Sequence, residues 1–433
     1  MASRPTGLSD NTTRMRGTTL PDAIEVTYRI LSYLPLEQAA DAIAGEQTTG
    51  TFTKVAGESP ELHRRHRAQI LEITSIDEDL SAPLPGARGR ENGILRAGLV
   101  RIGYPLVNSG ASLTRTLAFI SGNLYELSEL AGIKLLDIDF PEEFGTAYPP
   151  APHGITGTRK LVGRPSGVIL GTIVKPNIGL AARDYYQVVR ELGLAGLDFI
   201  KDDEVNADCP PTPLRDRVPQ IIRALDEVES ETGRRPLYAF NISDEVDHML
   251  ASADYIAEAG GKCVMVNTAI VGIPALCAVR RHTDLAIHGH LAGFAAASRH
   301  PNLGMGFTAF QKLARFAGVD HLHVGGFQSK FFVEDTETAA NVKAVRTPLL
   351  GGRECLPVVS SAQWAGTAPT TWQHTGTDDL LVLAGGGILG HPGGPDAGAR
   401  SMRQAWEAVA AGVSLPEAAK EHGELAAALA HFG

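Results

Sequence analysis

Short apolar runs and segments of helical periodicity alternate along the chain from about Gly167 to its end. The runs are rich in β-branched residues, which is typical of strands buried in a parallel sheet. Eight strands are predicted: Val168–Val174, Leu197–Lys201, Leu237–Ile242, Cys263–Asn267, Leu285–His288, His321–Val324, Leu356–Ser360 and Leu380–Ala384. The helices predicted between them include Ala182–Leu194, Pro213–Thr232, Glu245–Ala259, Met305–Ala317 and Ala397–Ala411. This alternation indicates a (β/α)8 TIM barrel over residues 151–433.

The first 150 residues have a different pattern, because strands and helices do not alternate regularly there. The predicted strands are Ala23–Ile30, Thr51–Val55, Gln69–Ile76 and Ile94–Ile102, and the predicted helices are Leu36–Ala44 and Leu113–Ile120. The Pro- and Gly-rich stretch Tyr148–Gly157 continues neither pattern and marks a boundary. The fold class is therefore α/β, with an N-terminal α+β domain over residues 1–150 followed by the barrel.

Composition narrows the classes of function. Hydrophobic residues make up 43% and charged residues 20% of the chain, which indicates a globular protein. The net charge of −10 and the absence of a Lys/Arg cluster speak against nucleic acid or an anionic membrane as partners. No apolar h-region opens the chain, and no uncharged run is long enough to span a membrane. The four cysteines form no CxxC pair, so reduced thiols and a cytoplasmic location are expected.

Polar residues follow the predicted strands at the end where TIM barrels build active sites. The first strand runs into Lys175, and the second ends in Lys201 followed by Asp203 and Glu204. Strand periodicity places Lys201 and Asp203 on one side, so that two carboxylates can converge on one point. Oxygen ligands of this kind suit Mg²⁺. A magnesium site at this end of the barrel is therefore predicted.

The remaining strand ends are polar as well. They carry Asn241, Asn267, His288-Gly289-His290, His321-Leu322-His323, Ser360-Ser361 and Gly385-Gly386-Gly387. The glycine run precedes a predicted helix, where exposed N–H groups can hold a phosphate. Each of these features alone is common in solvated turns. Their recurrence at one end of successive strands favours an active site.

These residues carry a resemblance to a known family. The segments GTIVKPNIGL (171–180), GLDFIKDDE (196–204), IHGH (287–290), HLHVGG (321–326), PVVSS (357–361) and AGGGILGHPGGPDAGA (384–399) resemble the large-subunit Rubisco superfamily, in the same order. In the N-terminal domain, EQTTGTF (46–52) and ISGNLY (120–125) are similar to the family's active-site segments. The resemblance covers nearly the whole chain.

The resemblance implies a role for each matching residue. Lys201 would be carbamylated by CO2 and bind Mg²⁺ with Asp203 and Glu204, while Lys175 would handle the proton of enolisation and His290 would shuttle protons. Lys330 would steady a carboxylate from a mobile loop. Substrate contacts would come from Thr172, Asn177, His323, Ser360, Gly385 and Gly386, and from Glu46, Thr51 and Asn123, which one subunit lends to its partner's site. A homodimer with shared sites follows, possibly assembled further, and no small subunit is expected.

Departures from the family pattern point away from CO2 fixation. Leu291 and Phe294 replace an arginine and a histidine, Asn177 replaces a lysine, Ser361 and Ala362 replace glycines, Phe52 replaces a tryptophan, and the loop before Lys330 is altered. A leucine cannot supply the bidentate anion clamp of an arginine. One of the two phosphate sites for a bisphosphate is therefore expected to be lost. The chain resembles the form IV, Rubisco-like proteins.

Three functions are open at this point. The first is a lyase of carbohydrate catabolism, a Mg²⁺-dependent decarboxylase that forms an enediolate from a phosphorylated keto sugar acid such as 3-oxo-isoapionate 4-phosphate. The second is the methionine-salvage enolase or isomerase of methylthio-sugar phosphates, against which Asn123 speaks, because that enolase has its lysine base at the matching position. The third is a non-catalytic regulatory protein. Carboxylation of ribulose bisphosphate is not expected.

Overall fold

The computed structural model describes residues 22–50, 55–77, 80 and 82–433. The chain divides into two compact units. One contains the residues up to Ala147 together with Ala296–Phe310, and the other contains Tyr148–Ala295 together with Gln311–Gly433. The first unit is named here the sheet unit and the second the barrel unit.

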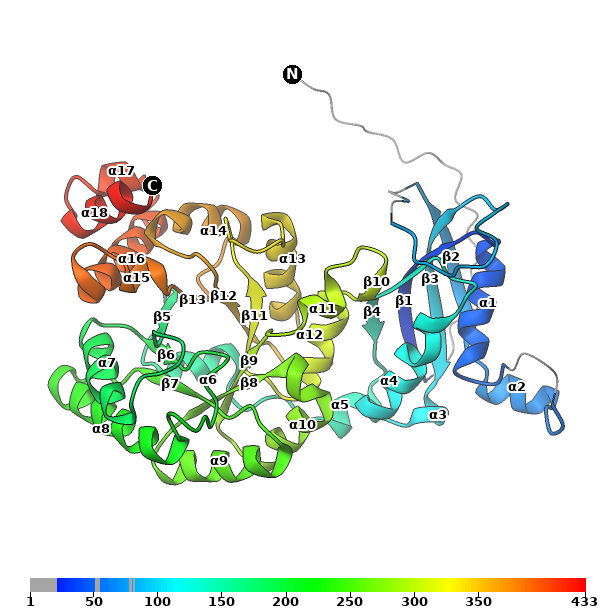
Figure 1. The fold of residues 1–433 in the computed structure, drawn as a ribbon, viewed down its shortest axis with the longest axis horizontal. Helices are drawn as coiled ribbons and strands as arrows, with labels where there is room; N and C mark the ends of the chain where they lie inside the picture. Colours follow the sequence, from blue (N-terminus) through cyan, green and yellow to red (C-terminus); the bar gives the residue numbers. More distant parts are fainter. Residues whose placement is uncertain (1–21, 51–54, 78–79, 81) are drawn as a thin grey trace, which may run out of the picture. The chain divides into compact units, whose positions relative to one another are not determined.

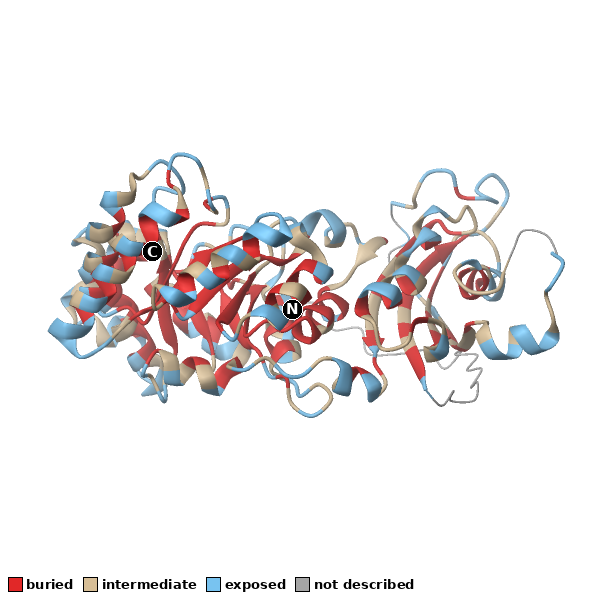
Figure 2. Cartoon of the chain, turned by 90° about the horizontal axis from the view of Figure 1, so that it is seen from below, coloured by how far each residue is buried: buried red, intermediate tan, exposed pale blue. Residues whose placement is uncertain are grey.

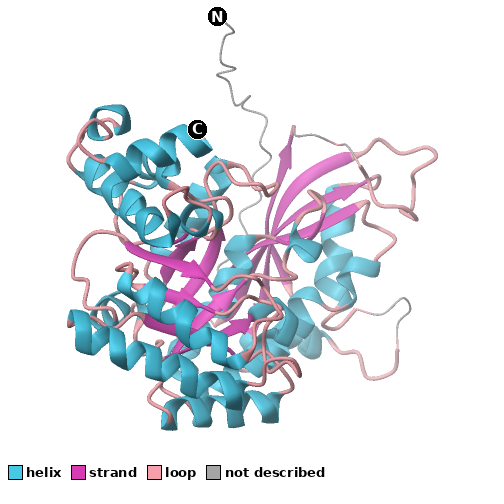
Figure 3. Ribbon diagram, turned by 60° about the vertical axis from the view of Figure 1, so that its left-hand side comes forward, coloured by secondary structure: helices cyan, strands magenta, loops and turns pink. Residues whose placement is uncertain are grey.

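Eight parallel strands close the barrel, which confirms the predicted TIM-barrel fold. In chain order they are β5 (Ile169–Ile173), β6 (Phe199–Lys201), β7 (Leu237–Asn241), β8 (Cys263–Asn267), β9 (Ala286–His290), β11 (His321–Gly325), β12 (Leu356–Val359) and β13 (Leu381–Leu383). Figure 3 shows helices surrounding these strands. Since each strand is paired on both sides, the barrel leaves no open edge.

Helices alternate along the chain with the barrel strands (Figure 1). They are α6 (Gly154–Leu161), α7 (Ala182–Leu194), α8 (Leu214–Thr232), α9 (Val246–Glu258), α10 (Thr268–His282), α11 (Ala295–Ser298), α12 (Phe307–Phe316), α13 (Asp335–Arg346), α14 (Ala368–Thr375), α15 (Gly386–Leu389), α16 (Gly394–Ala410), α17 (Leu415–Ala418) and α18 (Gly423–Phe432), with the 3₁₀ turn η2 (Ala365–Thr367). Their outward faces are exposed and the strands behind them are buried (Figure 2). This amphipathic pattern is the reason the helical periodicity is visible in the sequence.

The barrel interior is packed with apolar side chains. Phe199, Met265 and Leu381 lie in one buried cluster with residues from most of the other strands. Burying one such side chain stabilises the fold by about 1.5–3 kcal/mol. The packed interior therefore fixes the strand ends, and with them the polar residues that follow.

The sheet unit contains a five-stranded sheet of order β10-β4-β1-β3-β2. Its strands are β1 (Ala23–Ser32), β2 (Gln69–Ile76), β3 (Arg96–Pro105), β4 (Gly132–Asp139) and β10 (Leu303–Met305). The pairs are antiparallel except β10 with β4, which is parallel. The helices are α1 (Leu36–Glu46), α2 (Pro60–His66), α3 (Leu106–Ser109), α4 (Leu113–Ser121) and α5 (Glu143–Ala147), with the 3₁₀ turn η1 (Asn123–Glu126).

Several elements differ from the prediction. Helix α2 was not predicted because its sequence, PELHRRH, buries no residue and therefore has no apolar period; the Ser59 side chain caps it by accepting a hydrogen bond from the Leu62 N–H. Strands β4 and β10 were also missed, and Met305 belongs to β10 rather than to the start of a helix. Of the predicted strand Thr51–Val55, residues 51–54 lie outside the described part, and Val55 belongs to no strand.

The glycine run requires a correction as well. Gly386 and Gly387 do not precede a long helix but open the short helix α15, and the long helix α16 begins later, at Gly394. A tight turn of small residues suits the close packing there, since a Cβ on Gly387 would lie 2.3 Å from the Gln363 carbonyl oxygen. Within the described residues, no helix is both long and apolar enough to cross a membrane.

Candidate active site

Lys175 and Asp203 meet at the carboxyl ends of two neighbouring strands. The register of β5 with β6 pairs Ile173 with Lys201, so the segments that follow both strands run side by side. The Lys175 Nζ lies 2.7 Å from the Asp203 carboxylate and donates a second hydrogen bond to Asn177 Oδ1 at 2.5 Å. The structure therefore brings together three of the residues singled out in the sequence.

Lys201 is buried without a carboxylate partner. Its side chain is 1% exposed, and its Nζ donates to the Asp202 carbonyl at 2.9 Å and contacts Met265 Sδ at 3.5 Å. Burial lowers the pKa of Lys201 to about 8, although the negative charges of Glu204, Asp203 and Asp202 act in the opposite direction. A large fraction of this amine is therefore neutral at mildly alkaline pH, which is the form that reacts with CO2.

Two asparagines hold the backbone of Asp203 and Glu204. The Asn241 side-chain amide donates to the Asp203 and Glu204 carbonyls at 3.0 and 3.2 Å, and the Asn267 amide donates to the Glu204 carbonyl at 2.8 Å. Ser243 joins them, because its hydroxyl donates to Asn241 Oδ1 and accepts from the Asn267 N–H. These amides fix the direction in which the two carboxylates leave the chain.

Asp202 lies between Lys201 and Asp203 in the sequence, but its side chain makes structural contacts instead of lining the site. Its carboxylate accepts from Arg217 at 3.1 Å, from the Tyr238 hydroxyl at 2.7 Å and from the Asn241 N–H at 3.0 Å. Both Asp202 and Arg217 are fully buried. Asp202 is thus engaged within the fold, whereas the Asp203 carboxylate contacts Lys175 and that of Glu204 faces His290.

The donor set fits Mg²⁺ if Lys201 carries a carbamate. The described residues contain no group of three or more His, Cys, Asp or Glu side chains that could hold a metal. Asp203 and Glu204 supply two carboxylates, and an ammonium cannot be a ligand. A carbamate on the buried, weakly hydrogen-bonded amine of Lys201 would add an anionic oxygen donor of the kind that Mg²⁺ prefers.

Histidines occupy the next two strand ends. His288 Nε2 lies 2.9 Å from His323 Nε2, and His323 Nδ1 lies 3.0 Å from the Ser360 hydroxyl. The His290 ring packs on His323 with centroids 4.3 Å apart, and its Nε2 faces a Glu204 carboxylate oxygen at 3.8 Å. The Ala292 N–H donates to His290 Nδ1, so in the neutral ring the proton is on Nε2. Burial lowers the pKa of His288, His290 and His323 well below the usual range.

The candidate phosphate seat has open space in front of it. A Cβ on Gly386 would meet nothing within 4 Å, and one on Gly385 would meet only Ile173 Cδ1, at 3.8 Å. Nearby, the Thr172 hydroxyl donates to the Ala384 carbonyl at 2.9 Å and so ties β5 to β13. Gly385 and Gly386 therefore have room beside them for a ligand. Thr172, in contrast, is buried, and its hydroxyl already donates to a backbone carbonyl of the protein.

The loop that carries Lys330 follows β11. Lys330 is exposed, and its Nζ lies 5.4 Å from the centre of the Phe331 ring. At the base of this loop, the Gln363 amide donates to the Phe327 and Ser361 carbonyls. Ser361 and Ala362 have φ values of 77° and 53°, so they adopt the left-handed backbone that favours glycine, the residue type of the family pattern at both positions. The contacts of the described residues do not join Lys330 to the cluster at the strand ends.

The sheet unit carries the other predicted site residues. Glu46 ends α1, Asn123 opens η1, and both are exposed. In the amide orientation that gives both atoms a partner, the Gln47 side chain donates to the Ala118 carbonyl and accepts from the Asn123 N–H. Thr51 lies outside the described residues.

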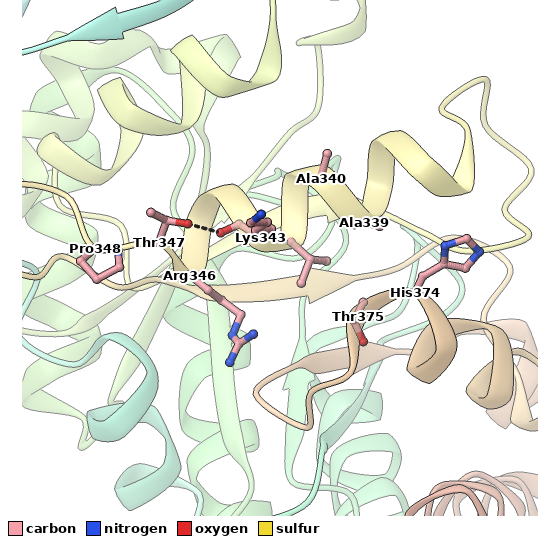
Figure 4. Close-up of a pocket in the computed structure, with 9 residues that line it drawn as sticks. Ala339, Ala340, Lys343, Arg346, Thr347, Pro348, His374 and Thr375 are labelled. Atoms are coloured by element: carbon pink, nitrogen blue, oxygen red, sulfur yellow. Dashed lines mark hydrogen bonds between the residues drawn. The ribbon is translucent and has the colours of Figure 1, made fainter. Parts of the chain in front are cut away.

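A cavity of about 520 Å³ lies elsewhere, on the outside of the barrel unit between α13 and α14. Figure 4 shows Lys343, Arg346 and His374 around it, with Thr347 donating to the Lys343 carbonyl. None of the predicted site residues lines it. The candidate site is therefore defined by the convergent strand ends and not by this cavity.

Sequence patterns missed some residues of this site. Asn241 and Asn267 were noticed only as polar strand ends, and their hold on the Asp203–Glu204 backbone depends on how neighbouring strands align. His288 was likewise noticed only as part of a polar strand end, and Gln363 was not predicted at all. The sequence does carry a signal for Asn241, Asn267 and His288, because each of these polar residues lies at or near the end of a buried strand.

Comparison with known proteins decides the family. The catalytic-domain model of the ribulose bisphosphate carboxylase large chain matches residues 154–432, and the model of its N-terminal domain matches residues 24–144. The chain belongs to the Rubisco large-chain family. The resemblance found in the sequence is thus confirmed.

Two relatives and two solved structures show where in the family it lies. A 3-oxo-isoapionate-4-phosphate decarboxylase of Rhizobium etli is 39% identical over 94% of this chain and 98% of its own length. A 3-oxo-isoapionate-4-phosphate transcarboxylase/hydrolase of Xanthobacter autotrophicus is 40% identical over 90% and 95%. A rubisco-like protein from Burkholderia fungorum has a TM-score of 0.89 at 38% identity and covers 95% of this chain and 100% of its own. A dimeric archaeal Rubisco from Hyperthermus butylicus has a TM-score of 0.84 at 31% identity, with 95% and 96% covered.

Proposed function

We propose that this Rubisco-like protein is a Mg²⁺-dependent decarboxylase of a phosphorylated 3-keto sugar acid, of the 3-oxo-isoapionate 4-phosphate type. The observation that carries the proposal is the buried Lys201 amine, with its lowered pKa, beside Asp203 and Glu204 at the end of β6. The named relatives support it, since two of them act on this substrate. Retention of Lys175, His290, His323 and Lys330 speaks against a non-catalytic role.

Lys201, as a carbamate, would hold Mg²⁺ together with Asp203 and Glu204. When bound, Mg²⁺ would stabilise the negative charge that builds up on the keto oxygen as the bond between the neighbouring carbon and the carboxylate breaks. Asn241 and Asn267 keep the two carboxylates in place through the backbone. The protein thus prepares its ligands before substrate arrives, which limits the reorganisation required during reaction.

The chain's own residues complete the reaction. When the bond to the carboxylate breaks, CO2 leaves and its electron pair remains on an enediolate, which must gain a proton at carbon. The Lys175 ammonium, held by Asp203 and Asn177, is the general acid proposed for this step. His290, with its Nε2 proton directed at Glu204, passes protons between the site and its surroundings. Lys330 contacts the carboxylate before it leaves.

The expected substrate carries one phosphate. Gly385 and Gly386 lie beside open space at the start of α15, whereas the side chain of Leu291, after β9, offers no donor to a second phosphate. Each charge-assisted hydrogen bond absent there is worth about 1.5–3 kcal/mol. Ribulose bisphosphate is therefore expected to bind weakly and not to be carboxylated.

Carbon balance tests the proposal. The protein, preincubated with bicarbonate and Mg²⁺, is given 3-oxo-isoapionate 4-phosphate, and released CO2 and remaining substrate are measured together. One CO2 for each substrate consumed is expected, and Lys175→Met, which keeps the side-chain length without a proton donor, should release none above background. Incorporation of ¹⁴CO2 into acid-stable product from ribulose bisphosphate would overturn the proposal.

A second function is supported by the transcarboxylase/hydrolase relative, whose identity to this chain is nearly the same as that of the decarboxylase. The two activities share a substrate, and they differ in whether the carboxyl group is released or transferred. Substrate consumption without release of CO2 would identify this second function.

We also propose a homodimer in which Glu46, Thr51 and Asn123 of one subunit complete the partner's site. The dimeric archaeal Rubisco supports this assembly. Mixing inactive Asn123→Ala and Lys175→Ala chains under subunit exchange should restore part of the activity. No recovery after proven exchange would contradict shared sites.

A further inference from the structure

Three side chains, on or directly after three neighbouring strands, form a chain of hydrogen bonds. His288 on β9 lies 2.9 Å from His323 on β11, Nε2 to Nε2, and His323 Nδ1 lies 3.0 Å from the Ser360 hydroxyl after β12. The first of these contacts joins two ring nitrogens of the same kind. One of them must therefore carry a proton and the other must accept it.

The remaining nitrogen of His288 decides the direction. His288 Nδ1 is buried and has no hydrogen-bond partner among the described residues. If His323 donated to His288, the His288 proton would sit on this Nδ1, and a buried N–H would be left without an acceptor. If His288 donates from Nε2, only an unpaired acceptor remains at Nδ1. Unpaired buried N–H groups are rarer in proteins than unpaired acceptors.

Both rings are neutral in this arrangement. His288 is fully buried and His323 is 5% exposed, and burial lowers the pKa of each well below the usual range. A neutral His323 that accepts at Nε2 carries its proton on Nδ1 and donates it to the Ser360 oxygen. The Ser360 proton then points elsewhere, and no described residue accepts it.

We propose that His288 is a positioning residue that, through His323, presents the Ser360 hydroxyl as a hydrogen-bond donor to an oxygen of the bound substrate. His288 itself does not contact the ligand in this scheme. The role in substrate binding rests on the proposed function, whereas the direction of the hydrogen bonds does not.

Nitrogen NMR of the ¹⁵N-histidine-labelled, ligand-free protein reads the direction. The expected tautomers are Nε2–H for His288 and Nδ1–H for His323, with a scalar coupling across the bond between the two Nε2 atoms. In His288→Met the thioether offers an acceptor but no donor, so His323 should move its proton to Nε2. In His288→Gln the side-chain amide can still donate, so the wild-type tautomer of His323 should be kept. Nδ1–H on His288, or a charged ring at neutral pH, would overturn the proposal.

Kinetics tests the consequence for the substrate. We expect kcat/KM to fall about fivefold to tenfold in His288→Met, the size of one lost hydrogen bond, and to recover in His288→Gln. In a Ser360→Ala background, His288→Met should cost nothing more, because both changes remove the same contact. Additive losses, with folding intact, would contradict the relay.

His321 supplies the matched control. It is equally buried, its ring is in contact with His288, and its Nε2 is bonded to the Thr158 hydroxyl. His321→Met should leave the His323 tautomer unchanged. If the protein does not act on the keto acid at all, the function proposal fails, and the tautomers of the free protein still decide this one.

Discussion

A buried ionisable side chain lies at each end of strand β6, and the two differ in how many partners of opposite charge contact them. Asp198, just before the strand, accepts hydrogen bonds from Arg234 and Arg403 at 2.6 and 2.7 Å and from the Leu170 N–H at 2.9 Å, and Arg164 lies 2.9 Å away. Lys201, at the other end, is just as buried and has one carbonyl and one thioether as partners. One charge is fully compensated and the other is not.

This difference separates stability from function within one strand. A buried carboxylate among arginines costs little while all partners are present and much when one is removed. A buried amine without a counter-ion is unfavourable in the charged form, so its pKa falls and it becomes reactive. In TIM barrels the amino-terminal end of the strands serves stability and the carboxyl end serves chemistry, and β6 shows both in a few residues.

The largest effect is expected at the functional end. Lys201→Met should lower kcat/KM for decarboxylation at least about 10³-fold, equivalent to about 4 kcal/mol, because it removes the amine on which the proposed carbamate ligand would form. The free energy of unfolding should not fall, since a thioether chain is cheaper to bury than an uncompensated amine. Steady-state kinetics and urea denaturation measure the two quantities on the same sample. If Lys201→Met retained its decarboxylase activity, the carboxyl end of β6 would not be the end that serves catalysis.

The next largest effect belongs to the other end. Asp198→Asn removes the charge that Arg164, Arg234 and Arg403 share, and should lower the free energy of unfolding by about 3 kcal/mol. Activity of the remaining folded protein should stay within about twofold, because the side chain does not reach the site. A large loss of kcat/KM without loss of stability would show that Asp198 acts on the site. Urea denaturation with kinetics at low temperature distinguishes the outcomes.

A smaller effect follows from pH. The pKa of Lys201 is about 8 in the folded chain and about 10.5 when unfolded, so between these values the unfolded state binds more protons and stability rises with pH. Between pH 7.5 and 9.5 this group should add about 2 kcal/mol to the free energy of unfolding. The difference between wild type and Lys201→Met, measured in CO2-free buffer, isolates this contribution. A difference that does not change with pH would mean that the amine is not desolvated.

Sequence patterns predicted the barrel and its polar strand ends because both follow from local chemistry. Strands buried on both faces appear as apolar runs, and Lys201 with Asp203 and Glu204 directly follows such a run. The contacts that give the site its properties are not local. The pairing of His288 with His323, and of Asn267 with the Glu204 carbonyl, requires the alignment of different strands. The left-handed backbone at Ser361 could not be predicted from the sequence either, because serine, unlike glycine, is not typical of that conformation.

The same reason explains the elements that were missed. Strand β10 has three residues, LGM, and no period can be read from so short a segment. Helix α2 is too polar to show an apolar face. Strand β10 owes its place to its pairing with β4, whereas α2 is set by its local start, the Ser59 cap followed by Pro60.

Strand β10 limits how this protein can be divided. A fragment ending near residue 147 would lack Leu303–Met305, which pair with β4, and β4 would become an unprotected edge open to association with other strands. Exchanging the N-terminal segments of two family members would also disturb this pairing, because the β4 of one protein would then pair with the β10 of the other. Chimaeras and split proteins should therefore carry residues 296–310 with the N-terminal segment, so that the natural unit of recombination is discontinuous in sequence.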